Sequence, residues 1–261
     1  AALTLRAGCD GAEPNAWTLW GFPEEPALPP GAGVLADLPY REEEIAPVFE
    51  ERRYSSGWGF PMGRWRARPP VPHELLPDAR PLRDGAPPAD ASVVVTHRLT
   101  DALLDWAEAG GRLVLLPSRC SLSLPTRIAT LWGQSPLVTG RGPTECGRRW
   151  IVDLLDLDLH RRWVRSVPTG EIDAGGGPLS ERVEPLVRLL GLHDARSLKV
   201  LDALFATRVG GGLLVVSCFD HWGVAGRRLL RRTVAWAAQT PAEAGADRDC
   251  PPAALRAMRN P

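Results

Sequence analysis

Long apolar runs, lysine and paired cysteines are scarce in this sequence of 261 residues. No apolar run approaches the roughly 20 residues that a helix needs to cross a bilayer, so we expect no membrane span and no membrane partner. Lys199 is the one lysine, and 31 basic residues balance 31 acidic ones, so no excess of charge predicts nucleic acid as a partner. The five cysteines lack C-x-x-C spacing, which predicts neither a disulfide framework nor a zinc site: Cys9, Cys120, Cys146, Cys218 and Cys250.

Nucleotide-binding signatures are also missing. No G-x-G-x-x-G follows an apolar run, and the glycines at 175–177 are not followed by Lys-Ser or Lys-Thr, as a phosphate-binding loop requires. We therefore expect no bound cofactor and no metal.

The sequence begins at Ala1 and runs directly into LTLRA, without a methionine or a leader. We expect a piece of a longer polypeptide, in which any targeting signal lies upstream. The sequence therefore does not predict a localisation.

The best specified stretch is 99–116, LTDALLDWAEAGGRLVLL, with the apolar run 92–96 before it. Thr100 is placed to cap a helix, Leu99 and Leu104 to staple its start, and Gly110 with Gly111 to end it. The flanking runs are continuously aliphatic, which is typical of strands covered on both faces. Strand, helix and strand at this spacing predict a right-handed parallel crossover and an α/β fold.

The last third of the chain shows a second regular region. We expect strands over 185–190 and 198–209, a glycine turn at 210–212, and a strand over LLVVSCF, which together form a hairpin. A helix is expected over 223–238, with four arginines on a solvated face: Arg227, Arg228, Arg231 and Arg232. Residues 241–261 are expected to form a tail that docks on a partner or stays loose.

The first 22 residues carry an alternating pattern. Leu3 and Leu5, then Trp17 and Leu19, flank a polar turn, as in two antiparallel strands. Two interpretations stay open: these are terminal strands left over from a β-sandwich, or a hairpin at the edge of the main sheet. Residues 23–240 then form the α/β domain, with a strand expected over 34–38.

Residues 54–90 are too rich in proline and glycine for a helix or a central strand, so we expect a long surface loop. Its tryptophans, Trp58 and Trp65, stand among arginines. They either pin the loop to its own core, contact a partner or stack on a sugar, and the first interpretation is favoured. Short helices are expected over 126–132 and 150–159.

A cysteine amidotransferase is the first catalytic hypothesis, because Cys120 and Cys218 each follow an apolar run. Such a nucleophile needs a tight strand-to-helix turn flanked by glycines, and neither PSRCSLS nor VVSCFDH has them. No histidine begins a His-x-Glu pair. We therefore predict no amidotransferase activity and assign no catalytic residue.

Two other hypotheses concern sugars and clefts. No pair of carboxylates for glycoside hydrolysis can be placed, and the eight strand-helix units of a barrel are not present. His97, Asp220 and His221 lie where the carboxyl edge of a parallel sheet would open. They either bind a ligand there or cap the helix that starts near Gly223, and capping is favoured.

Three phrases in this order carry a family resemblance: NAWTLWGFP, LTDALLDWAEAGGRLVLLP, and EPLVRLLGLHDARSLKVLDALFATRVGGGLLVVSCFDH. Over 15–238 the chain resembles the C-terminal region of large family 2 glycoside hydrolases, beta-galactosidase-like proteins. In these proteins a sandwich strand leads into a glutamine-amidotransferase-like module, and the catalytic glutamates lie in an upstream barrel.

The resemblance implies a three-layer, mostly parallel sheet of the class I glutamine-amidotransferase-like, flavodoxin-related kind. It implies a non-catalytic accessory module that supports domain packing, oligomerisation or substrate access in a carbohydrate-active enzyme. Its partners are then the barrel and β-sandwich domains of the same polypeptide or a second copy. The alternative is a free-standing sugar-binding or carbohydrate-processing protein with a cleft near His97, Asp220 and His221.

Overall fold

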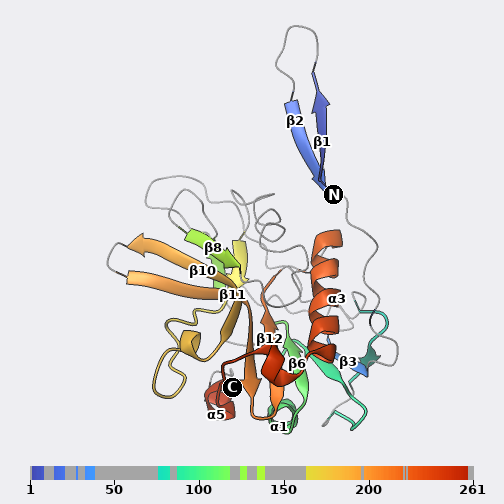
Figure 1. The fold of residues 1–261 in the computed structure, drawn as a ribbon, viewed down its shortest axis with the longest axis vertical. Coiled ribbons are helices and arrows are strands. Elements are labelled where there is room, and N and C mark those ends of the chain that lie inside the picture. The colour runs from blue at the N-terminus through green and yellow to red at the C-terminus, as the bar shows by residue number, and fades with distance from the viewer. Residues whose placement is uncertain are drawn as a thin grey trace.

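A computed structural model of the chain shows an eight-stranded sheet with helices packed on it (Figure 1). The structure describes residues 2–8, 15–20, 28, 33–38, 76–82, 87–117, 124–127, 134–138, 163–194, 197–219, 221 and 223–257. The expected helix over 150–159 and Cys120 lie outside these residues.

The sheet has a parallel half and an antiparallel half, in the order β4-β3-β5-β6-β12-β11-β10-β8. The parallel strands are β3 (Val34–Asp37), β4 (Arg80–Pro81), β5 (Val93–Thr96), β6 (Arg112–Leu115) and β12 (Gly212–Ser217). The antiparallel strands are β11 (Ser197–Val209), β10 (Glu184–Asp194) and β8 (Gln134–Val138). Four of the seven pairings are parallel, which confirms the predicted α/β fold with a mostly parallel sheet.

Two hydrophobic clusters cover the two faces of the parallel half. Because successive strand residues point to opposite faces, Val93 and Val95 lie in one cluster and Val94 lies in the other. The first cluster includes Leu230 and Val234 of α3 (Gly223–Gln239), and the second includes residues of α1 (Asp101–Glu108). The sheet is therefore the middle of three layers, as its continuously apolar strands predicted.

Helix α1 begins and ends where the sequence predicts. The Thr100 hydroxyl accepts a hydrogen bond from the backbone N–H of Leu103 at 3.3 Å. At the other end, Gly110 has a φ of 114° and donates to the Ala107 carbonyl, while Gly111 donates to the Trp106 carbonyl. These two bonds form a Schellman motif, which needs a residue of positive φ and so favours glycine.

Strands β11 and β12 form the predicted hairpin, with a two-residue turn at Gly210 and Gly211. The Gly211 N–H donates to the Glu108 carbonyl at 2.9 Å, so the turn lies against the end of α1. A Cβ on Gly212 would lie 2.1 Å from the Ala107 carbonyl oxygen. Only a glycine lets the hairpin approach the helix this closely.

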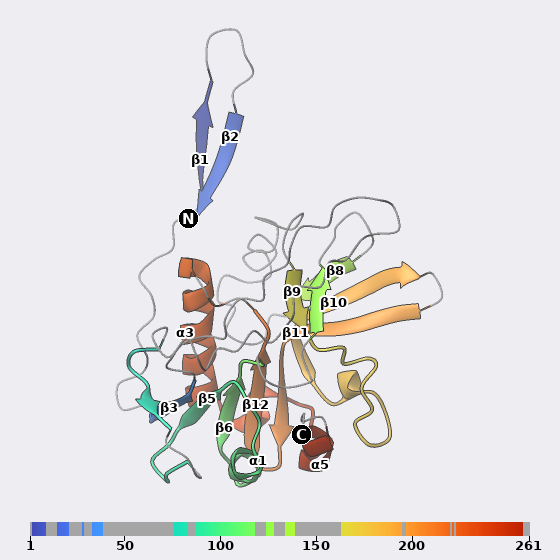
Figure 2. The ribbon, with the colours of Figure 1, turned by 180° about the vertical axis from the view of Figure 1, so that it is seen from behind.

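The N-terminal ribbon consists of β1 (Ala2–Ala7) and β2 (Asn15–Trp20), which pair antiparallel as predicted. The register sets Leu3 opposite Leu19 and Leu5 opposite Trp17. Both views show the ribbon extending away from the sheet (Figures 1 and 2). Leu3 is 61% exposed and Leu5 is 53% exposed.

Two other segments, β7 and helix α3, differ from expectation. Leu124–Arg127 is a strand, β7, paired with β9 (Trp163–Ser166), so the helix predicted from Thr126 is wrong at its first two residues. On α3, Arg228 and Arg232 are buried rather than solvated. Burial lowers the pKa of the Arg232 guanidinium.

The expected tail folds onto the body of the same chain. It contains α4 (Ala242–Gly245) and α5 (Pro252–Ala257), and Leu255 is buried in the cluster beneath α1. Arg256 forms ion pairs with Asp101 and Asp105 of α1. Among the described helices, none combines the length and apolar character that a membrane crossing requires.

Candidate functional site

The polar residues with the best claim to function lie at the carboxyl edge of the parallel strands. The register aligns Asp37, Thr96, Leu115 and Val216 across β3, β5, β6 and β12. The strands therefore end within one residue of the same level, and the residues that follow, including His97, stand at that edge. Ligands of open α/β sheets bind outside this edge.

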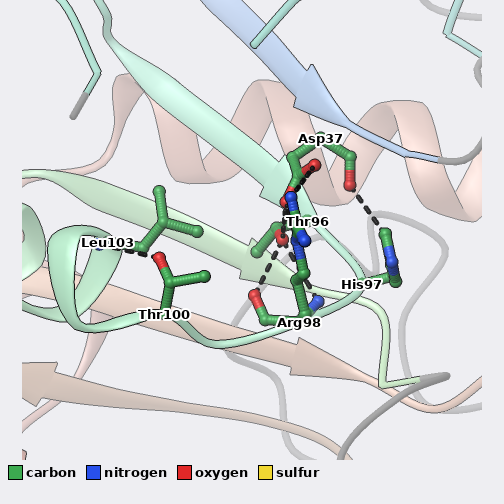
Figure 3. A network of polar contacts seen from close by, with 6 residues as sticks. All are labelled: Asp37, Thr96, His97, Arg98, Thr100 and Leu103. Atoms are coloured by element: carbon green, nitrogen blue, oxygen red, sulfur yellow. Dashed lines mark hydrogen bonds and ion pairs between the residues drawn. The ribbon is translucent and has the colours of Figure 1, made fainter. Parts of the chain in front are cut away.

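Asp37 is the centre of the first polar cluster (Figure 3). Arg98 donates to its carboxylate twice, from Nε to Oδ2 at 2.9 Å and from Nη2 to Oδ1 at 3.3 Å. The Thr96 Oγ1 lies 3.1 Å from the same Oδ2 and accepts from the Arg98 backbone N–H at 3.2 Å. The cluster therefore ties the end of β3 to the turn that leads from β5 into α1.

His97 joins this cluster through the backbone. Its Nδ1 lies 2.8 Å from the Asp37 carbonyl oxygen, which can only accept, so Nδ1 carries the proton in this contact. The histidine is 5% exposed. Its ring thus fastens β5 to β3 from within the protein.

Ser217 and His221 form the second cluster, between the end of β12 and α3. The Ser217 Oγ lies 3.1 Å from His221 Nε2, and His221 Nδ1 lies 3.3 Å from the Gly226 carbonyl oxygen. Since the carbonyl needs a donor, Nδ1 carries a proton in this contact, and Nε2 shares a hydrogen bond with the serine hydroxyl. Ser217 and His221 are each 1% exposed, so the pair joins the strand to the helix inside the fold.

Cys218 follows this serine and is 6% exposed. Nucleophiles of amidotransferase and hydrolase folds sit on a strained strand-to-helix turn. Within the described ranges, positive φ angles occur at glycines alone, so Cys218 does not adopt a positive φ. This thiol is therefore not presented as such a nucleophile.

The glycine loop at 175–177 binds a carboxylate of its own chain. The backbone N–H groups of Gly175 and Gly176 donate to Asp173 Oδ1 at 3.0 and 3.3 Å. These amide contacts, chiefly that of Gly176, lower the pKa of Asp173. The backbone N–H groups of this loop therefore bind the Asp173 carboxylate, whereas those of a phosphate-binding loop would bind a phosphate.

Of the candidate binding residues singled out from the sequence, the two that the structure describes lie in separate clusters. The structure places His97 with Asp37 and His221 with Ser217, on strands separated by β6. Trp58, Trp65 and Asp220 lie outside the described residues.

Sequence reasoning missed Asp37 and Arg98. A usable signal was present, because Asp37 lies at the end of one run predicted to be a strand and Arg98 follows a second such run.

In the part of the chain that the structure describes, no group of three or more His, Cys, Asp or Glu side chains is arranged to hold a metal ion. Comparison of the chain with protein-family models and with curated proteins found no match in either.

Proposed function

We propose that the chain is a non-catalytic accessory module of a carbohydrate-active enzyme of the family 2 glycoside hydrolase kind, and that the β1–β2 ribbon packs against a β-sheet of a neighbouring domain. The observation that carries this proposal is the exposure of Leu3, 61%, and Leu5, 53%. Alternate residues of a strand share a face, so these leucines form an apolar stripe on one side of β1.

A two-stranded ribbon is marginally stable in water, and an additional strand or a packed face is what normally stabilises it. The ribbon extends from the body in both views (Figures 1 and 2), and neither Leu3 nor Leu5 belongs to the two hydrophobic clusters of the sheet. An exposed apolar stripe of this kind marks an interaction surface.

The size of the ribbon favours a partner on the same polypeptide. Each strand has six residues, so the pair presents a face of about 20 Å by 10 Å. A stable complex of separate proteins buries about 800 Å² on each partner. A covalently joined domain is held at high effective concentration and needs a smaller contact.

The scaffold agrees with the proposed family. Numbered along the chain, the parallel strands lie in the order 2-1-3-4-5 across the sheet. That is the order of flavodoxin-like doubly wound sheets. We therefore assign the class I glutamine-amidotransferase-like fold as part of the proposal, with Cys218 and His221 serving the interior of the fold.

Hydrogen exchange tests this proposal. The amides of β1 and β2 should exchange more slowly in the full polypeptide encoded around the chain than in residues 1–261 alone, because a covering domain protects them. Leu5→Gln should abolish the added protection, whereas Thr4→Gln, on the opposite face of the same strand, should preserve it. Equal exchange in the two proteins would overturn the proposal.

A further inference from the structure

The order of the parallel strands reverses between β3 and β5. From β3 the chain moves outward to β4, and it then returns past β3 to β5 and β6. Leu76 and Ala79, just before β4, pack in the cluster that contains α3, whereas α1, just after β5, packs on the other face. This reversal of strand order makes the carboxyl ends of β3 and β5 the topological switch point, where doubly wound sheets bind their ligands.

An ion pair occupies this point. Asp37 ends β3 and Arg98 follows β5, and their side chains are joined by the two hydrogen bonds of 2.9 and 3.3 Å. The side chain of Arg98 is 46% exposed and that of Asp37 is 15% exposed. Thr96 also contacts the Asp37 carboxylate (Figure 3). The exposed fractions show that the pair reaches the surface.

The opposite charges of Asp37 and Arg98 determine which class of ligand the pair can bind. The guanidinium repels cations and the carboxylate repels anions, so the pair as a whole favours neither. A hydroxyl group both donates and accepts, so vicinal hydroxyls can donate to the carboxylate and accept from the guanidinium together. In dinucleotide-binding doubly wound folds an acidic residue hydrogen-bonds a ribose hydroxyl.

We propose that the Asp37–Arg98 pair is a binding site for neutral polyhydroxyl compounds, such as a sugar ring with vicinal hydroxyls. The site contains no residue of the β1–β2 ribbon. A failed test of this site therefore leaves the proposed accessory role unaffected, and a failed test of that role leaves this site unaffected. It also differs from the cleft expected from the sequence, because His97 and His221 are turned into the protein while Arg98 is half exposed.

Nuclear magnetic resonance titration of residues 1–261 tests the site. The probes are methyl β-D-galactoside, D-ribose and myo-inositol, with acetate and phosphate as charged comparisons. The Arg98 Nε–H signal should shift with at least one neutral probe at millimolar concentration and should not shift with acetate or phosphate. Arg98→Ala should weaken binding at least about tenfold, since it removes charge-assisted hydrogen bonds.

Two further variants separate binding from folding. Asp37→Asn keeps the shape of the side chain and removes its charge, and it should also weaken binding. Arg80 lies on the outermost parallel strand, β4, and forms an ion pair of 2.8 Å with Asp90. Arg80→Ala removes this pair and should leave binding unchanged. The proposal is wrong if no neutral probe binds the wild-type chain, if acetate or phosphate binds instead, or if Arg98→Ala and Asp37→Asn, folded by circular dichroism, bind as the wild type does.

Discussion

Arg188 holds the carboxylate of Asp202 with two hydrogen bonds, from Nε at 2.8 Å and from Nη2 at 2.9 Å. The Asp202 side chain is completely buried, and Thr169 donates a third hydrogen bond to it. The same guanidinium also donates to the Ser180 carbonyl. These contacts join β10 and β11 to the segment around 167–181, so an enclosed ion pair links the antiparallel half of the sheet to that segment.

The first prediction concerns this ion pair. Arg188→Met should lower the free energy of unfolding by about 3–5 kcal/mol, because it leaves a buried carboxylate without its counterion. The double variant Arg188→Met/Asp202→Leu should be more stable than the single one, since no charge stays buried. Urea denaturation measures both.

The exposed pair Arg80–Asp90, with side chains 56% and 64% exposed, supplies the control for that experiment. Arg80→Met should cost less than about 1 kcal/mol, because solvent screens exposed pairs. If Arg188→Met and Arg80→Met lowered the free energy of unfolding equally, the structural role given to Asp202 would be contradicted.

The second prediction concerns the contact between α1 and the β11–β12 turn. Gly212→Ala should lower the free energy of unfolding by about 2–4 kcal/mol, because its Cβ meets the backbone oxygens of Ala107 and Gly111. Gly177→Ala, whose Cβ meets only the end of the Glu181 side chain, should cost under about 1 kcal/mol. Thermal unfolding compares the two, and similar midpoints would show that helix and turn can separate at little cost.

The third prediction concerns Cys250. Burial, with a smaller effect of Asp249, raises the pKa of its thiol from 9.0 to about 11. Between these values the unfolded chain loses the proton and the folded chain keeps it, so stability falls as pH rises, by up to about 1.4 kcal/mol per pH unit. Urea midpoints at about pH 8 and about pH 10 measure the fall. The Cys250→Ala variant should show a smaller decline than the wild type, and an equal decline would refute the assignment to this thiol.

Elements whose signals are local could be predicted accurately. Helix α1 is specified by Thr100 at its start and by Gly110 at its end, a few residues from the groups that they bond. The β11–β12 hairpin is specified in the same way by adjacent glycines. Strand β7 was not predicted, because Leu124–Arg127 contains a proline and pairs with a strand about 40 residues away.

The sequence by itself determined the apolar runs, the caps and the turns, and through them the α/β class, because each of these depends on neighbours in the chain. Only the tertiary structure decided that Asp37 meets Arg98, which lies 61 residues away. It also decided that Arg228 and Arg232 are buried and that Arg256 returns to α1. The physical reason is that strand order and layer packing bring distant residues together, and charged side chains carry no local periodicity that reveals their partners.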